Sequence, residues 1–371
     1  MKYIKKLKLI LYIVGITVLP LQIFAITIKV AILENLLSQK LPSVNYMHDY
    51  LAGIKVAGMV AHDRGINIEY QYFPYNNAPL NILTKINAVE EYNPDVIIGP
   101  RVAEQFIVLK FYLKNILVLS PLVNANEVFE LPSNFHTMSL PLQYSARAMY
   151  IFINKFISKP KHIFLFTAID YTSSLEISAE FYKEYRNAHP EVPIISYKFL
   201  ADKVDDLDVS GLVKTYMPGD IVITPNFSYL ASIIMNKVLT AVNGDGLIFV
   251  GGDQWGPTDI KYIQNLRSKY KFTDYRLVQW SVNDASQDGR QFRKYYKQLF
   301  NTAPANVISY ITFRTLLFAI QFADVNQNGP QKEIILKNFM ESKKSSKNNI
   351  YYVYKNGNSI QIEHFKIASW R

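Results

Sequence analysis

The sequence predicts an α/β protein with two lobes, each a parallel β-sheet covered by helices. From residue 26 onward, apolar runs of about four to seven residues alternate with amphipathic stretches of about 12–18 residues, a pattern typical of strands joined by helical crossovers. The 371 residues are about twice the length of a typical domain. Because 49% of the residues are hydrophobic and only 19% are charged, the composition excludes a disordered chain and a coiled coil.

Residues 26–120 contain the first series of these elements. The apolar residues Leu51, Ile54 and Ala57 recur at helical spacing, and Gly65 stands where a C-terminal cap is expected. Strands are predicted at 28–33, 66–73, 96–98 and 116–120, and helices at 46–62, 81–92 and 102–112. Four strands with helical crossovers suffice for one α/β lobe.

A second series follows, and it ends in a predicted β-hairpin. Strands are predicted at 162–166, 194–199, 221–224, 247–250 and 275–280, and helices at 144–156, 174–189, 207–216, 231–242 and 259–270. Three more helices are predicted at 287–300, 307–323 and 331–341, followed by a polar loop at 343–347. The hairpin strands 351–354 and 360–367 flank Asn356-Gly357, the strongest short-range hairpin signal.

The first 25 residues have the pattern of a secretory signal peptide. Four lysines lie within the first eight residues, an apolar stretch covers 9–24, and Ala25 suits the residue before a cleavage site. An uncleaved membrane anchor is the alternative, because the apolar stretch approaches the length of about 18–20 residues that spans a bilayer. Pro20 favours cleavage. We therefore expect a periplasmic protein, and the absence of cysteine excludes a lipid-modified N-terminal cysteine.

Several classes of chemistry lack their residues. The chain has no cysteine, which excludes a thiol nucleophile, a disulfide framework and thiolate metal sites. None of the six histidines forms an HxH or HExxH pair, and no GxSxG, GxxxxGK or GxGxxG motif occurs. We therefore expect a protein that is not an enzyme and that has no cofactor and no metal.

The positive charge does not predict a nucleic-acid partner. The formal net charge is +10, and four of these charges are the lysines of the signal segment. The remaining excess is mild and scattered through the chain, so it indicates general surface charge.

Short motifs along residues 26–371 together resemble one family. They are the opening strand IKVAIL, the sequence VIIGP at 96–100, the turn Leu119-Ser120-Pro121, the turn Gly251-Gly252-Asp253 and the closing hairpin VYKNGNSIQIEHFKI. In addition, Tyr46 lies seven residues before Gly53. The chain thus resembles the type I periplasmic binding proteins, specifically the leucine/isoleucine/valine-binding branch of transporter-associated solute receptors.

The resemblance implies a small-molecule ligand between the two lobes and assigns residues to it. Asp253 matches the acid that holds the ligand ammonium group, and Asn124 matches a hydroxyl-bearing residue that touches both charged groups. The loop after Gly99-Pro100 matches the segment that binds the ligand carboxylate. The resemblance carries over nine ligand-binding residues in all: Tyr46, Arg101, Ala103, Glu104, Leu122, Asn124, Phe227, Asp253 and Trp280.

The sequence departs from the family pattern at the first-lobe loops. The stretch after Gly99 has no hydroxyl-bearing residue, and Asn124 stands where the family has Ser or Thr. Arg101 is positioned to pair with a carboxylate in place of the serine, or it is a solvated surface residue. Asp253 and Asn124 have alternative roles as turn or cap residues, and Tyr46, Phe227 and Trp280 as packing residues.

The resemblance implies a monomeric solute-binding protein of an ABC transporter, which binds an amino acid or a similar small polar solute by hinge closure and delivers it to a membrane permease. The lobes would comprise 26–140 with 281–348, and 141–280 with 349–371. The alternative is an orphan module that keeps the fold but regulates an envelope partner or a sensor without transport. A third class, an enzyme on this fold, is disfavoured by the missing motifs.

Overall fold

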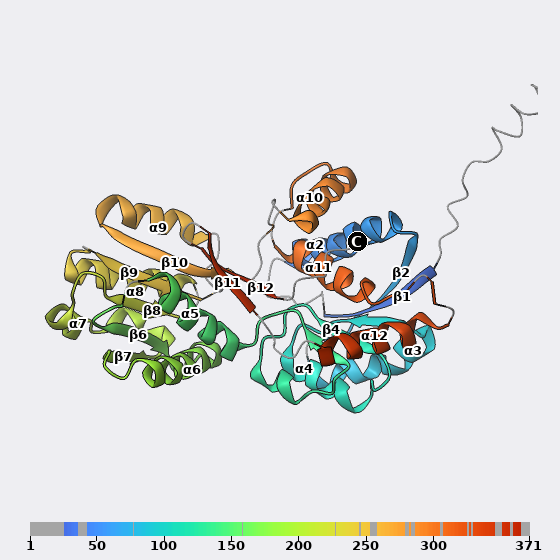
Figure 1. Cartoon of the computed structure of the whole chain (residues 1–371), viewed down its shortest axis with the longest axis horizontal. Coiled ribbons are helices and arrows are strands. Elements are labelled where there is room, and N and C mark those ends of the chain that lie inside the picture. The colour runs from blue at the N-terminus through green and yellow to red at the C-terminus, as the bar shows by residue number, and fades with distance from the viewer. Residues whose placement is uncertain are drawn as a thin grey trace, which may run out of the picture. The chain divides into compact units, whose positions relative to one another are not determined.

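The computed structural model describes residues 26–35, 43–76, 78–157, 159–226, 228–244, 246–252, 258–278, 282, 286–304, 307–324, 326–327, 329–345, 351–356 and 359–364. The chain divides into two compact units (Figure 1). The first takes its residues from 1–99, 111–119 and 283–341, and the second from 100–110, 120–282 and 342–371. The lobe boundaries proposed from the sequence stay a prediction.

The first sheet has five strands in the order β2-β1-β3-β4-β5. β1 pairs in parallel with β2 and with β3, and β3 pairs in parallel with β4. The residues of β3 and β4 are all buried, as expected for a parallel sheet that is covered on both faces. The strands are β1 (Ile26–Leu33), β2 (Ile66–Phe73), β3 (Val96–Ile98), β4 (Leu117–Ser120) and β5 (Phe135–Thr137).

Two helices of the first unit pack unusually closely. α2 (Ser43–His62) lies beside α11 (Ile308–Ile320), as Figure 1 shows. A Cβ atom at Gly53 would lie 1.9 Å from the Thr312 Oγ1 atom and 2.2 Å from the Ser309 carbonyl oxygen. Gly53 therefore permits this close approach of the two helix backbones. Because the helices are so close, the Thr312 hydroxyl donates a hydrogen bond to the Tyr50 carbonyl oxygen, at 3.0 Å.

The second sheet has seven strands in the order β11-β12-β10-β9-β8-β6-β7. All neighbouring pairs are parallel except β11 and β12, which form an antiparallel hairpin. The strands are β6 (Ile163–Ala168), β7 (Ile194–Phe199), β8 (Ile221–Thr224), β9 (Leu247–Gly251), β10 (Phe272–Val278), β11 (Tyr351–Asn356) and β12 (Ser359–His364).

Each face of the seven-stranded sheet has its own hydrophobic core. Successive strand residues point to opposite faces. Ile163 and Leu165 pack with α5 (Leu142–Phe156) and α6 (Thr172–Ala188). Phe164 and Phe166 pack on the other face, with α7 (Ser210–Thr215), α8 (Ser228–Val242) and α9 (Thr258–Lys269).

The remaining four helices are divided between the two units. They are α3 (Ile86–Tyr92), α4 (Ala103–Val108), α10 (Gln287–Phe300) and α12 (Gln331–Ser345). Short 3₁₀ helices cover Pro79–Lys85, Leu109–Phe111, Asn126–Glu130 and Ala201–Asp206. Within the described ranges, no helix combines the length and the apolar character that a membrane span requires.

Most predicted elements are confirmed, and the differences have local causes. The hairpin forms, and Gly65 adopts a φ of 75° after α2. The helix predicted over 81–92 begins as a 3₁₀ helix at Pro79 and becomes α-helical only at Ile86. β5 was not predicted, because three residues are too few to show a strand period. The polar loop predicted over 343–347 was wrong in part, since α12 continues to Ser345.

Candidate functional site

The carboxyl ends of the parallel strands are the first place to look for a site, because ligands of open α/β sheets bind there. In the five-stranded sheet, β1 is followed by Glu34 and Asn35, both buried. β3 is followed by Gly99 and Pro100, and β4 ends at Ser120. This edge therefore carries buried polar residues next to loops.

Gly99 is the residue that lets β3 end close to β1. Its φ is 105°, a conformation that other residues rarely adopt. A Cβ atom at this position would lie 2.1 Å from the Leu33 carbonyl oxygen and 3.5 Å from the Glu34 Oε2 atom. The Gly99 N–H also donates to the Leu119 carbonyl oxygen at 2.8 Å. The VIIGP motif is thus explained by the backbone geometry of this edge.

Buried hydroxyl groups connect the loops that follow β3, β4 and β5. The Ser120 hydroxyl donates to the Pro100 carbonyl oxygen at 2.6 Å and accepts from the Val123 N–H at 3.1 Å. The Thr137 hydroxyl donates to the Val123 carbonyl oxygen. The Ser139 hydroxyl donates to the Pro121 carbonyl oxygen at 2.9 Å. Because these hydroxyls donate hydrogen bonds to backbone carbonyl oxygens, they hold the loops in place.

The structure places three of the predicted ligand residues on these two neighbouring loops and two at the start of the helix that follows the first loop. Arg101, Leu122 and Asn124 are half-buried. Ala103 and Glu104 lie in the first turn of α4, and Glu104 is exposed. The Ser120 hydrogen bond to Pro100 brings the two loops together. The Asn124 carbonyl oxygen accepts from the Leu142 N–H at 3.0 Å, so this loop is also anchored to the start of α5.

The other four predicted ligand residues are not placed in the same detail. Tyr46 lies in α2, near its start. Phe227, Asp253 and Trp280 lie outside the described residues. Asp253 comes two residues after the end of β9 and Trp280 two residues after the end of β10, so both follow strands of the seven-stranded sheet. Their contacts with a ligand stay a prediction.

A single buried amide organises the carboxyl end of the seven-stranded sheet. The Asn226 Nδ2 atom donates to the Phe166 carbonyl oxygen at 2.9 Å and to the Thr224 Oγ1 atom at 3.0 Å. Its Oδ1 atom accepts from the Ser174 hydroxyl at 2.7 Å and from the Ala168 N–H at 3.3 Å. Asn226 therefore joins the ends of β6 and β8 to the start of α6.

Exposed side chains lie at the same end of this sheet. Ile169 follows β6, Leu200 follows β7 and Tyr229 lies near the start of α8, and each is roughly half exposed. Asp170 and Asp202 are exposed beside them. The sequence analysis did not single out these five residues, although each comes shortly after a predicted strand. The strands that these residues follow are neighbours only through the order β7-β6-β8, which the sequence does not display.

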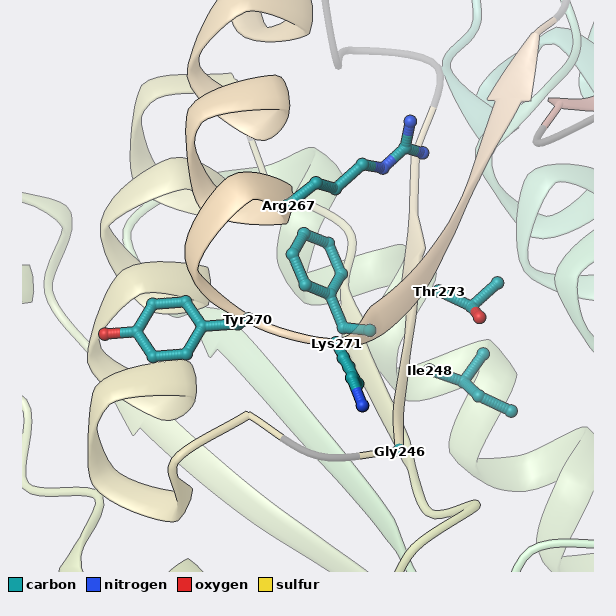
Figure 2. Close-up of a pocket in the computed structure, with 7 residues that line it drawn as sticks. Gly246, Ile248, Arg267, Tyr270, Lys271 and Thr273 are labelled. Carbon is teal, nitrogen blue, oxygen red and sulfur yellow. The ribbon is translucent and has the colours of Figure 1, made fainter.

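A pocket of the second unit lies at the opposite end of its sheet. Figure 2 shows residues that line it, around the starts of β9 and β10. Its volume is about 570 Å³. The Arg267 guanidinium and the Lys271 amine point in different directions, and the Tyr270 hydroxyl points away from both. The Arg267 Nε atom donates to the Asp274 carboxylate at 3.0 Å. The polar groups therefore do not converge on a ligand.

The structure brings together no metal-binding set in the part of the chain that it describes. No group of three or more His, Cys, Asp or Glu residues is arranged to hold a metal ion there. The chemistry available at the strand ends is therefore that of hydrogen bonds, charges and aromatic rings.

No protein-family model and no curated protein sequence matches the chain, but solved structures do. The structure of LivJ from Streptococcus pneumoniae, a branched-chain amino acid transporter substrate-binding protein in complex with isoleucine, has a TM-score of 0.59 at 13% identity, over 91% of this chain and 99% of that chain. An ABC transporter substrate-binding protein from Desulfitobacterium hafniense complexed with Leu has a TM-score of 0.60 at 11% identity, over 91% and 95%.

A third structure has a different ligand. It is a solute-binding protein of an ABC transporter from R. palustris in complex with 4-hydroxybenzoate, with a TM-score of 0.58 at 11% identity, over 91% of this chain and 96% of that chain. The similar structures are thus substrate-binding proteins whose ligands include amino acids and an aromatic acid. With its two largely parallel sheets, their covering helices and this structural similarity, the chain has the fold of the type I periplasmic binding proteins.

Proposed function

We propose that this chain is a solute-binding protein of an ABC transporter, and that it binds an amino acid or a similar small polar solute. The observation that carries this proposal is the fold, which it shares over nearly its whole length with substrate-binding proteins. Polar side chains follow the carboxyl ends of the strands in both sheets, and proteins with open α/β sheets bind their ligands at these ends. The proposed activity is binding without catalysis, and the proposed partner is a membrane permease.

In this proposal the ligand charges are recognised by charged side chains from the strand ends. Arg101 follows β3 and offers a guanidinium that suits a carboxylate. Asp253 follows β9 and offers a carboxylate that suits an ammonium group. Asn124 offers an amide at the neighbouring loop. Segment 1–25 is proposed to be a cleaved signal peptide that directs the chain to the periplasm.

The test is thermal unfolding of ligand-free protein against a panel of amino acids, short peptides, amides and small carboxylates. A solute at a hundredfold excess over its Kd stabilises the folded state by about 2.7 kcal/mol, which a melting curve resolves easily. The Asp253→Ala variant is expected to lose the shift for solutes with an ammonium group. The exposed Asp206 provides the matched control, because Asp206→Ala removes one carboxylate and is expected to keep the shift.

If no solute of the panel raised the melting temperature of folded, ligand-free protein, this proposal would be contradicted. It would favour the orphan module, in which the fold is kept and a protein partner is regulated. The sequence feature that motivates this alternative function is the absence of hydroxyl side chains from the loop after Gly99.

A further inference from the structure

The five-stranded sheet is bordered by β2, which has a strand on one side only. β2 comes first in the order β2-β1-β3-β4-β5, so β1 is the one strand that pairs with it among the described residues. Its eight residues, Ile66–Phe73, run in unbroken register against Ile26–Leu33. A regular strand of this length at the border of a sheet is a template on which another strand can pair.

The ladder geometry identifies the backbone groups on the outer side of β2. The Lys29 N–H donates to the Asp95 Oδ2 atom at 2.7 Å, and the Lys29 carbonyl oxygen accepts from the Asp95 N–H at 2.8 Å, so both groups of Lys29 face β3. The residues before and after Lys29 therefore face β2, and in a parallel pair they bond to Glu69, which lies opposite Lys29. The N–H and carbonyl groups of Ile68 and Tyr70 consequently face outward.

The side chains of β2 form an apolar row and a polar row on opposite faces of the strand. Ile68, Tyr70 and Tyr72 share one face, and the Tyr70 side chain is 38% exposed. Glu69 and Gln71 lie on the other face and are exposed. A strand added beside β2 would cover part of the Tyr70 ring, which favours pairing.

The other border strands carry features that discourage pairing. β5 has only three residues. β7 contains the exposed Lys198, and β11 contains Lys355. Short strands and lysines are devices by which proteins keep border strands from pairing. β2, in contrast, contains no lysine, proline or glycine, and Glu69 is its one charged residue.

We propose that β2 pairs with β2 of a second copy of this chain, antiparallel and around a two-fold axis at Tyr70. A two-fold interface joins the same surface of both copies. In this register Tyr70 lies opposite Tyr70, Ile68 opposite Tyr72, and Glu69 opposite Gln71 of the second copy. Pairs of an aromatic and a β-branched residue stabilise antiparallel strands, whereas like charges directly opposite each other destabilise them. An axis at Glu69 would place two carboxylates opposite each other, and the proposed register avoids this.

The proposal goes beyond the proposed function and differs from the monomer that the resemblance to solute receptors implies. A pair of eight-residue strands is a smaller interface than the roughly 1,600 Å² of a standard protein complex, so we expect a weak dimer with a Kd on the order of 10–100 μM. The panel of solutes and the state of association are measured separately, so either proposal can fail without the other.

The first experiment is sedimentation equilibrium of the purified protein over about 5 to 300 μM, a range that brackets the expected Kd. The Tyr70→Lys variant places two like charges opposite each other and is expected to raise the Kd at least about tenfold. The matched control is Tyr182→Lys, which changes an exposed tyrosine of α6 and is expected to leave the Kd within about twofold. Segment 1–25 is the same in all these proteins, so it does not affect the comparison.

The second experiment tests the register and uses the absence of cysteine from the chain. Tyr70→Cys is expected to form a disulfide-linked dimer with oxidised glutathione, because a hydrogen-bonded antiparallel pair places its Cα atoms about 5.5 Å apart, within the range that a disulfide spans. Glu69→Cys is the control, since its thiols would be diagonal neighbours about 7–8 Å apart and are expected to stay unlinked. Non-reducing electrophoresis measures the linked fraction.

Three results would overturn the proposal. The first is a protein that stays monomeric up to about 300 μM. The second is a dimer that Tyr70→Lys weakens no more than Tyr182→Lys does, because its interface would then lie elsewhere. The third is a larger linked fraction for Glu69→Cys than for Tyr70→Cys, which would show another register. Circular dichroism verifies the folding of each variant, and the two cysteine variants still test the pairing if Tyr70→Lys does not fold.

Discussion

The carboxyl ends of the two sheets are stabilised in different ways. At the five-stranded sheet, the hydroxyls of Ser120, Thr137 and Ser139 are buried and bonded to backbone carbonyl oxygens. At the seven-stranded sheet, the buried amide of Asn226 makes four hydrogen bonds, and the residues around Tyr229 remain exposed. We call the carboxyl end of the five-stranded sheet the first edge and that of the seven-stranded sheet the second edge. At the second edge, one buried residue holds the strand ends together while other residues stay exposed. At the first edge, the polar side chains themselves hold the loops in place.

The largest expected effect tests how tightly the first edge is built. Gly99→Ala is expected to destabilise the fold by about 4 kcal/mol, because the new Cβ atom would overlap the Leu33 carbonyl oxygen and the φ is positive. Gly219→Ala is the control, since Gly219 has a φ of 91° but nothing within 4 Å of a Cβ atom. It is expected to cost about 1 kcal/mol. Urea unfolding measures both, and equal losses would show that crowding at Gly99 is unimportant.

The next effect concerns the buried amide of the second edge. Asn226→Ala is expected to lower the free energy of unfolding by about 3 kcal/mol, because it leaves buried partners such as the Phe166 carbonyl oxygen without their hydrogen bond. The control is Asn154→Ala, which removes an exposed amide that contacts His189. It is expected to change the free energy by about 0.5 kcal/mol or less. A similar small loss for Asn226→Ala would contradict its structural role.

A smaller loss of stability is expected at the first edge, because several hydroxyl groups hold its loops and each substitution removes only one of them. Ser120→Ala is expected to cost about 1.5 kcal/mol, since it removes one donor to Pro100 and one acceptor for Val123. Ser268→Ala provides the comparison, because that hydroxyl bonds within an exposed helix and its loss is expected to be near zero. A loss at Ser120 as large as that at Asn226 would remove the distinction between the two edges.

The smallest effect is a titration at the second edge. The pKa of Tyr229 is raised above the ordinary value of 10.0, chiefly by desolvation and then by the hydrogen bond to Tyr171. The folded state thus keeps this proton to higher pH than the unfolded state. The resulting stabilisation is present below about pH 10 and is lost as the pH rises through the folded-state pKa.

The Tyr171→Phe variant tests the cause of this shift. It removes the hydrogen bond and is expected to move the pKa of Tyr229 down toward 10.0. The difference between the ultraviolet titration curves of each protein and its Tyr229→Phe counterpart isolates this phenol. An unchanged midpoint would mean that the hydrogen bond to Tyr171 does not contribute, and that desolvation and nearby charges account for the whole shift.

The fold was largely predictable from the sequence, because its strands are short apolar runs between amphipathic helices. The strand predicted at 247–250 is confirmed as β9, and the Asn356-Gly357 signal coincides with the hairpin of β11 and β12. The motif VIIGP was informative for a physical reason, since only glycine fits at Gly99. The three residues of β5 were missed because so short a segment shows no period.

The site was less predictable, for reasons of topology. Asp170, Asp202 and Tyr229 follow three different strands; Asp202 comes 32 positions after Asp170, and Tyr229 comes 27 positions after Asp202. Only the sheet order β7-β6-β8 brings their strands together, and no local pattern encodes this order. The residues carried over from the family, in contrast, were located by short motifs, and Arg101, Leu122 and Asn124 do lie on neighbouring loops.

The position of the hairpin has a consequence for the order in which the protein can be assembled during synthesis. β12 lies beside β10 in the seven-stranded sheet, and the helices α10 and α11, with α12 as far as Glu341, belong to the first unit. Both units therefore contain segments from the last quarter of the chain. A ribosome releases those segments after the other parts of both units, so each unit must wait for contacts that are distant in sequence, and such contacts slow folding. A nascent chain of this design stays incompletely folded until these segments have left the ribosome.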